Sequence, residues 1–259
     1  QALSGGSVDI AIMGAVISNI TSRGVGRVFI TNNIESGTAM IFVDPDSGIT
    51  SVEDLVGKEL ATTQGTTAHV LLATALQASD QDPNAVNIVN MDMPSAVSAF
   101  INGAVPALST WWPFTARVIN ERPDAVILTQ AEDYYPDAAI MGGWVANTRF
   151  YNQNRDTLVT LAKVWLEANE ILMTDTANSL TRLQAEQYPD LSLEDLTNGF
   201  EQLRSFDNDA WAELYKDGSV LNWIGQVEQV FVDIGALDSF VDPSEFVDTS
   251  IYLEAYESQ

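Results

Sequence analysis

Short apolar segments alternate with helix-forming segments along the first half of the sequence, and this alternation restricts the fold more than any other feature. Runs of β-branched and apolar residues bounded by Gly, Pro, Asn or Asp predict strands, whereas apolar residues at helical spacing predict helices. Strands are expected at residues 8–13, 27–30, 39–43, 59–63, 85–90, 107–111 and 140–146. Intervening helices are expected at 15–22, 52–56, about 67–78 and 94–101. We therefore predict an α/β fold with parallel sheets.

The pattern changes after residue 137, where long amphipathic segments dominate. Residues 156–174 place Leu158, Leu161 and Leu172 on one helical face, and residues 193–204 and 218–234 show the same periodicity. The tryptophans of this part, Trp165, Trp211 and Trp223, are interpreted as packing residues.

The charge balance restricts the partners. Eleven Lys and Arg residues stand against 36 Asp and Glu residues, which gives a formal net charge of −25. Such a chain is not expected to bind nucleic acid or an anionic membrane. A small anion is still compatible, because bulk charge is screened over roughly 8–10 Å whereas main-chain N–H groups act at contact distance.

Two residue types needed for common catalytic and metal chemistry are scarce. There is no cysteine, which excludes disulfides, iron–sulfur clusters and a thiolate nucleophile, and His69 is the one histidine. A usual zinc site cannot be assembled, and His69 is expected to line a pocket or a helix surface rather than to act in a triad. The apolar runs are too short for a membrane span and the start has no signal-peptide pattern, so we expect a mature soluble chain with no metal or cofactor.

Residues 63–69 (TQGTTAH) join an expected strand to an apolar helix through a turn rich in hydroxyl groups. The first N–H groups of a helix have no intrahelical acceptor and carry partial positive charge, so such a turn can hold an anion. Gly65, Thr66 and Thr67 would supply the donors. The alternative is an ordinary helix N-cap, and this segment alone does not decide between them.

Five segments resemble, in the same order, the NMT1/THI5-like solute-binding proteins of ABC importers for taurine, alkanesulfonates and nitrate. They are residues 3–10 (LSGGSVDI), 49–61 (ITSVEDLVGKELA), 65–69 (GTTAH), 90–103 (NMDMPSAVSAFING) and 111–114 (WWPF). The resemblance covers most of the chain, thins beyond about residue 180, and is strongest to the taurine and sulfonate branch.

The resemblance implies a type II periplasmic-binding-protein fold, with two lobes and a ligand cleft. Lobe I would comprise residues 1–40 and 132–259, and lobe II residues 41–131. Two crossovers, near 35–40 and 129–136, would form the hinge whose closure a permease senses. It also implies a monomeric protein, periplasmic or anchored at the cell surface, with a small-molecule solute and ABC permease subunits as partners, and no covalent chemistry.

The sequence departs from the family pattern in two places. Relatives usually have a strand, a helix and another strand before the segment that matches residues 3–8, so lobe I is expected to lack one βαβ unit and to leave an unpaired sheet edge. Pro106 also stands where the family usually has aspartate.

The candidate ligand-binding residues lie at expected strand ends or at the helix start, where open α/β sheets present ligands. Of the adjacent tryptophans, we expect one ring to face the ligand, with Trp111 favoured over Trp112. Asp92 either binds an ammonium or hydroxyl group or caps the helix that begins near residue 94. The complete set is Met13, Gly14, Gly65, Thr66, Thr67, His69, Asp92, Trp111, Trp112, Gly142 and Trp144.

Taurine or another organosulfonate is the favoured ligand, with nitrate and a thiamine-precursor pyrimidine as alternatives. One rival reading is an enzyme, because pyrimidine-forming enzymes of thiamine biosynthesis share the fold. They need a lysine for pyridoxal phosphate, and Lys58, Lys163 and Lys216 are not at an expected cleft edge, so we predict no enzyme activity. A sensory ligand-binding domain of the same fold is the other rival, and the sequence does not separate it from an importer component.

Overall fold

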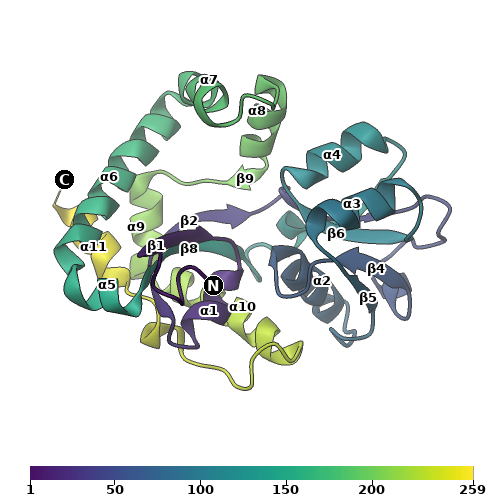
Figure 1. Ribbon diagram of the computed structural model, residues 1–259, viewed down its shortest axis with the longest axis horizontal. Coiled ribbons are helices and arrows are strands. Elements are labelled where there is room, and N and C mark those ends of the chain that lie inside the picture. The colour runs from purple at the N-terminus through teal and green to yellow at the C-terminus, as the bar shows by residue number, and fades with distance from the viewer. Residues whose placement is uncertain (259) are drawn as a thin grey trace. The chain divides into compact units, whose positions relative to one another are not determined.

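The computed structural model describes residues 1–258 and divides into two compact units (Figure 1). Unit 1 comprises Gln1–Ile34, Met141–Gly225 and Val241–Gln259, and unit 2 comprises Glu35–Ile140 and Gln226–Phe240. The chain therefore passes between the units four times, whereas the sequence analysis expected two crossovers.

Residues 226–240 differ most from the expected boundaries, which placed them in lobe I. They begin inside helix α10 (Ser219–Asp233) and pack in unit 2. Gln226 Nε2 donates to the main-chain oxygen of Asp137 at 2.8 Å, and Gln77 Nε2 donates to Asp233 Oδ2 at 2.7 Å. The helical periodicity was read correctly, but it does not reveal that the two halves of one helix pack in different units.

Unit 2 is built on a five-stranded sheet with the order β5-β4-β6-β3-β7. β4 pairs in parallel with β5 and β6, whereas β3 pairs antiparallel with β6 and β7. The sheet is thus mixed, and the expectation of a parallel sheet was wrong for β3, which runs opposite to its neighbours β6 and β7. Alternation of strands and helices fixes the order of elements but not the direction of a strand that enters after a crossover. The strands are β3 (Ala39–Val43), β4 (Glu59–Thr62), β5 (Asn87–Asn90), β6 (Ala107–Trp111) and β7 (Val126–Gln130).

The residues of helix α2 from Thr67 to Leu76 are all buried. Most of them are apolar, which is typical of a helix enclosed by other elements. Phe42 of β3 and Phe100 of α3 meet in the neighbouring core, with ring centroids 6.4 Å apart. The helical segments of this unit are η1 (Glu53–Leu55), α2 (Thr67–Ala78), α3 (Met93–Ile101), α4 (Phe114–Glu121) and η2 (Ala131–Tyr134).

Unit 1 contains a four-stranded sheet with the order β1-β8-β2-β9. β1 pairs antiparallel with β8 and is an edge strand, and the Ile12 side chain on it is 58% exposed. Residues 203–204, expected as the end of a helix, form β9 instead. The strands are β1 (Ile10–Met13), β2 (Gly26–Glu35), β8 (Ile140–Asn147) and β9 (Leu203–Arg204).

The helices α6, α9 and α11 pack together in unit 1 (Figure 1). Tyr215 and Tyr252 stack with ring centroids 4.1 Å apart, and the Tyr215 hydroxyl accepts from the main-chain N–H of Thr31 on β2 at 2.7 Å. The helices of this unit are α1 (Val16–Thr21), α5 (Thr148–Gln153), α6 (Arg155–Thr174), α7 (Thr176–Gln187), α8 (Leu193–Glu201), α9 (Asn208–Lys216), the first part of α10, η3 (Pro243–Glu245) and α11 (Thr249–Glu257).

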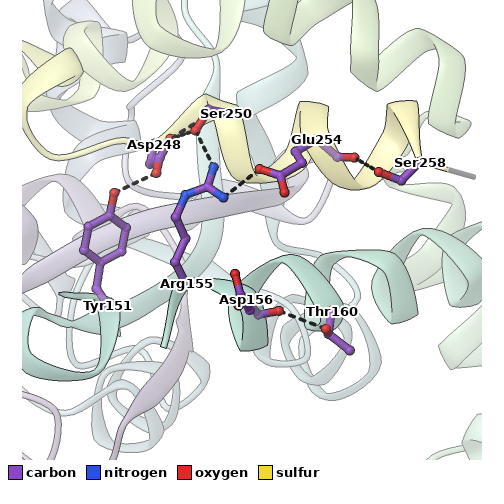
Figure 2. A network of polar contacts seen from close by, with 8 residues as sticks. All are labelled: Tyr151, Arg155, Asp156, Thr160, Asp248, Ser250, Glu254 and Ser258. Atoms are coloured by element: carbon purple, nitrogen blue, oxygen red, sulfur yellow. Dashed lines mark hydrogen bonds and ion pairs between the residues drawn. The ribbon is translucent and has the colours of Figure 1, made fainter. Parts of the chain in front are cut away.

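A polar network fastens the C-terminal helix to the rest of unit 1 (Figure 2). Tyr151 donates to Asp248 Oδ2 at 2.6 Å, and Arg155 donates to Glu254 Oε2 at 2.6 Å. Burial and the bond to Asp248 raise the pKa of Tyr151 to about 12, so its hydroxyl remains a donor at ordinary pH. No helix within residues 1–258 has the length and apolar character that a membrane span requires.

Candidate functional site

The loop between β4 and α2 is held against the end of β5. Thr63 Oγ1 donates to the main-chain oxygen of Met91 at 2.8 Å, and the main-chain N–H of Gln64 donates to Asn90 Oδ1 at 3.0 Å. Because β4 and β5 are parallel, their carboxyl ends meet at one edge of the sheet, which is where ligands bind in open α/β sheets.

Gly65 and His69 form a hydrogen bond within this loop. Gly65 has a φ of +75°, and its N–H donates to Nδ1 of His69 at 3.1 Å. His69 is 6% exposed, and burial lowers its pKa from 6.5. The imidazole is therefore neutral at pH 7, with an acceptor at Nδ1 and its proton on Nε2. The sequence analysis assigned the Gly65 N–H to a ligand, but in the structure this group binds His69.

Thr66 is the N-cap residue of α2, with extended backbone and no capping hydrogen bond from its side chain. Its hydroxyl donates instead to the main-chain oxygen of Thr63 at 2.7 Å. A bond from the sheet also holds the start of α2, because Ser109 Oγ on β6 donates to the main-chain oxygen of Ala68 at 2.8 Å. The Thr66 side chain therefore provides no cap for the first turn of α2.

Asp92 follows β5 and caps α3. Its Oδ1 accepts from the main-chain N–H of Ser95 at 3.0 Å, and its Oδ2 accepts from the Ser95 hydroxyl at 2.9 Å. These bonds lower the pKa of Asp92. Both carboxylate oxygens thus serve the helix, in the capping arrangement that the sequence analysis offered as the alternative to ligand binding.

The adjacent tryptophans at the end of β6 have different surroundings. Trp111 packs edge-on against Phe114, with ring centroids 6.0 Å apart, and against the core of unit 2. Trp112 follows the strand, and its main-chain N–H donates to the oxygen of Thr38 at 2.8 Å. The ring favoured from sequence as the ligand contact is therefore the one that contacts the core.

In unit 1 the structure brings Met13 and Gly142 together at the sheet, with Asn33 beside them. A Cβ at Gly142 would lie 2.5 Å from Asn33 Oδ1 and 3.0 Å from the main-chain oxygen of Met13. Only glycine allows the Asn33 amide to approach this closely. Asn33 was missed by the sequence analysis because the Asn32-Asn33 pair near the end of a strand carries no motif. The Gly14 carbonyl accepts from the N–H of Ile17 at the start of α1.

Trp144 lies opposite Ile12 in the β1–β8 register and packs edge-on against Phe29, with ring centroids 6.5 Å apart. Its Nε1–H is buried and has no hydrogen-bond partner within the described part of the chain. A buried donor of this kind is costly unless a ligand or water accepts from it. Across residues 1–258 no group of three or more His, Cys, Asp or Glu side chains is placed to hold a metal ion.

Comparison with known proteins shows to which family the chain belongs. A family model described as NMT1/THI5 like matches residues 1–178. A putative binding protein of Brucella abortus is 24% identical over 246 residues, covering 95% of this chain and 76% of that protein. The taurine-binding periplasmic protein of Escherichia coli is 27% identical over 123 residues, covering 47% of this chain and 38% of that protein.

Solved structures share the fold. The periplasmic aliphatic sulphonate binding protein SsuA of Escherichia coli aligns with a TM-score of 0.75 and 18% identity, over 97% of this chain and 84% of SsuA. The desulfurization enzyme DSZB aligns with a TM-score of 0.64 and 15% identity, over 96% of this chain and 85% of DSZB. The architecture is therefore that of the periplasmic binding proteins.

Proposed function

Since this chain belongs to the NMT1/THI5-like family, we propose that it is the extracytoplasmic solute-binding component of an ABC importer. Its partners would be a small solute and the permease subunits of the transporter. The two units would act as the two lobes of the binding protein.

We propose an organosulfonate as the solute, held by its anionic end at the first turn of α2. The observation that carries this proposal is the hydrogen bonding of the loop before α2. The Thr66 hydroxyl binds Thr63 and leaves the start of a twelve-residue buried helix without a side-chain cap. The positive end of the helix dipole at such a helix start favours a sulfonate or another oxyanion without needing a cationic side chain.

The other candidate solutes have weaker support. Asp92, the carboxylate that could have held the ammonium group of taurine, has both oxygens bound to Ser95. Within the proposal, this favours sulfonates that lack an ammonium group over taurine. Nitrate and a pyrimidine remain alternatives, and so does a sensory role of the same fold.

An enzyme is the least supported reading. The chain lacks cysteine, and its Lys216 binds Glu213 at 3.2 Å and lies over the Tyr256 ring. The relatives that match by sequence are named as binding proteins. DSZB shares the fold alone at 15% identity, so it carries no activity over to this chain.

The test is a calorimetric titration with taurine, ethanesulfonate, hexanesulfonate and nitrate, using two variants of Thr67. Thr67→Pro removes the first helical N–H and is tolerated at this position, since proline suits the first helical turn and Thr66 already has extended backbone. Thr67→Val is the matched control, because it removes the hydroxyl and keeps the N–H.

We expect Thr67→Pro to weaken sulfonate binding by about tenfold or more, the loss of one charge-assisted hydrogen bond, with Thr67→Val close to the unmodified protein. Thermal unfolding should show that both variants are folded. Equal affinities for Thr67→Pro and Thr67→Val would remove the α2 site. Absence of binding by any sulfonate would remove the ligand class.

A further inference from the structure

A pocket lies within unit 2, lined by residues other than those at the α2 N-terminus. It is a cavity of about 240 Å³ between the second half of α2, the chain just before β8 and the second half of α10. Its floor is apolar and includes the buried side chains of Ala139, Val227 and Val230. This volume accommodates a short alkyl chain.

Three glutamine amides line the pocket, and each donates one N–H to a protein atom. Gln77 and Gln229 donate to the two carboxylate oxygens of Asp233 at 2.7 and 2.8 Å, and Gln226 donates to the main-chain oxygen of Asp137 at 2.8 Å. Each amide keeps a second N–H donor, and its carbonyl oxygen can only accept. Gln226 Oε1 is buried and has no hydrogen-bond partner among residues 1–258.

The charged side chains that line the pocket are negative. Asp137 and Asp233 are the charged side chains that line the pocket, and no Lys or Arg does. An anion would therefore meet carboxylates and carbonyl oxygens, whereas a primary ammonium could donate to several of them at once.

We propose that this pocket binds a small primary alkylammonium ion, with the ammonium group among Asp233, Gln226 and the neighbouring acceptors, and the alkyl chain on Val227 and Val230. The inference is independent of the proposed sulfonate site, since it uses different residues and a ligand of opposite charge. An experiment that contradicts one of the two proposals therefore leaves the other unaffected.

The test uses n-butylammonium chloride with two comparison ligands at constant ionic strength, so that general screening of the acidic surface is the same throughout. Butanol has a similar alkyl chain without charge, and tetramethylammonium has the charge without N–H donors. We expect saturable binding of one n-butylammonium per chain, weaker binding of butanol and no site-specific binding of tetramethylammonium. Amide NMR should place the shifts at the side-chain NH₂ groups of Gln77, Gln226 and Gln229.

Two variants separate a site from bulk charge. Asp233→Asn keeps the shape and removes the carboxylate, and should weaken n-butylammonium binding about tenfold. Asp124→Asn removes one exposed charge of the same unit outside the pocket, and should leave binding unchanged. Equal effects of the two substitutions, equal binding of butanol, or shifts spread over the acidic surface would each overturn the proposal.

Discussion

The main-chain N–H of Gly65 donates to Nδ1 of His69 in the loop between β4 and α2, and His69 is 6% exposed. This bond requires the Nε2–H tautomer. We expect long-range ¹⁵N–¹H NMR spectra near pH 7 to show an unprotonated Nδ1 and a protonated Nε2. The chain has a single histidine, so assignment is unambiguous. An Nδ1–H tautomer would contradict the loop geometry.

Folding stability should depend on the protonation of His69. Burial lowers the pKa of His69 below 6.5, so between these two pKa values the unfolded chain binds more protons than the folded one. The contribution of His69 to the free energy of unfolding is therefore fully present above about pH 6.5, and it is lost as the pH falls from there through the pKa of the folded state. Protonation also removes the acceptor for Gly65.

Urea unfolding of the unmodified protein and of His69→Gln at about pH 7.5 and 5.5 measures this effect. The loss of stability on acidification should be smaller in the variant. Carboxyl groups titrate in both proteins alike, so the difference between the two losses isolates His69. Equal losses would show that the imidazole is not buried in neutral form.

The contact between Gly142 and Asn33 should make Gly142 intolerant of a side chain. Gly142→Ala places a methyl group 2.5 Å from Asn33 Oδ1, and we expect it to lower the free energy of unfolding by about 1–3 kcal/mol. Denaturant unfolding of the two single variants and the double variant Gly142→Ala/Asn33→Ala gives the coupling. The double variant should lose less than the sum of the single losses, and strict additivity would exclude the clash.

Trp111 should contribute mainly to stability through its contact with Phe114. We expect Trp111→Leu to lower the free energy of unfolding by about 1–3 kcal/mol, since it removes part of an aromatic pair on the unit 2 core. Phe114→Leu should cost a similar amount, and the two losses should not add, because both remove one contact. Thermal and denaturant unfolding measure this. Full additivity would show that the rings do not support each other.

Much of the local structure follows from short-range pattern. β3 and β6 have the predicted bounds, because each is a compact apolar run between turn residues. The direction of a strand and the division of α10 between the two units depend on contacts between residues distant in sequence, such as Gln226 with Asp137. A short stretch of sequence does not contain both partners of such a contact. β9 has two residues, too few for a periodic signal.

The candidate site was predicted less completely than the fold. The position of the loop before α2 followed from the strand–turn–helix pattern, but which groups remain for a ligand did not. That depends on His69 and Thr63 taking the Gly65 N–H and the Thr66 hydroxyl, a competition between side chains that the residue types alone leave open. Asn33 became recognisable only through the close packing over Gly142.

The division of each unit into separated chain segments affects how the protein is made. Unit 2 needs residues 226–240 and unit 1 needs the segment from Val241, so neither core can close while the nascent chain is still short. Contacts of such long sequence separation form slowly. The newly made polypeptide therefore stays incompletely packed, with the apolar residues of helix α2 prone to aggregation, until residues 226–240 have been made.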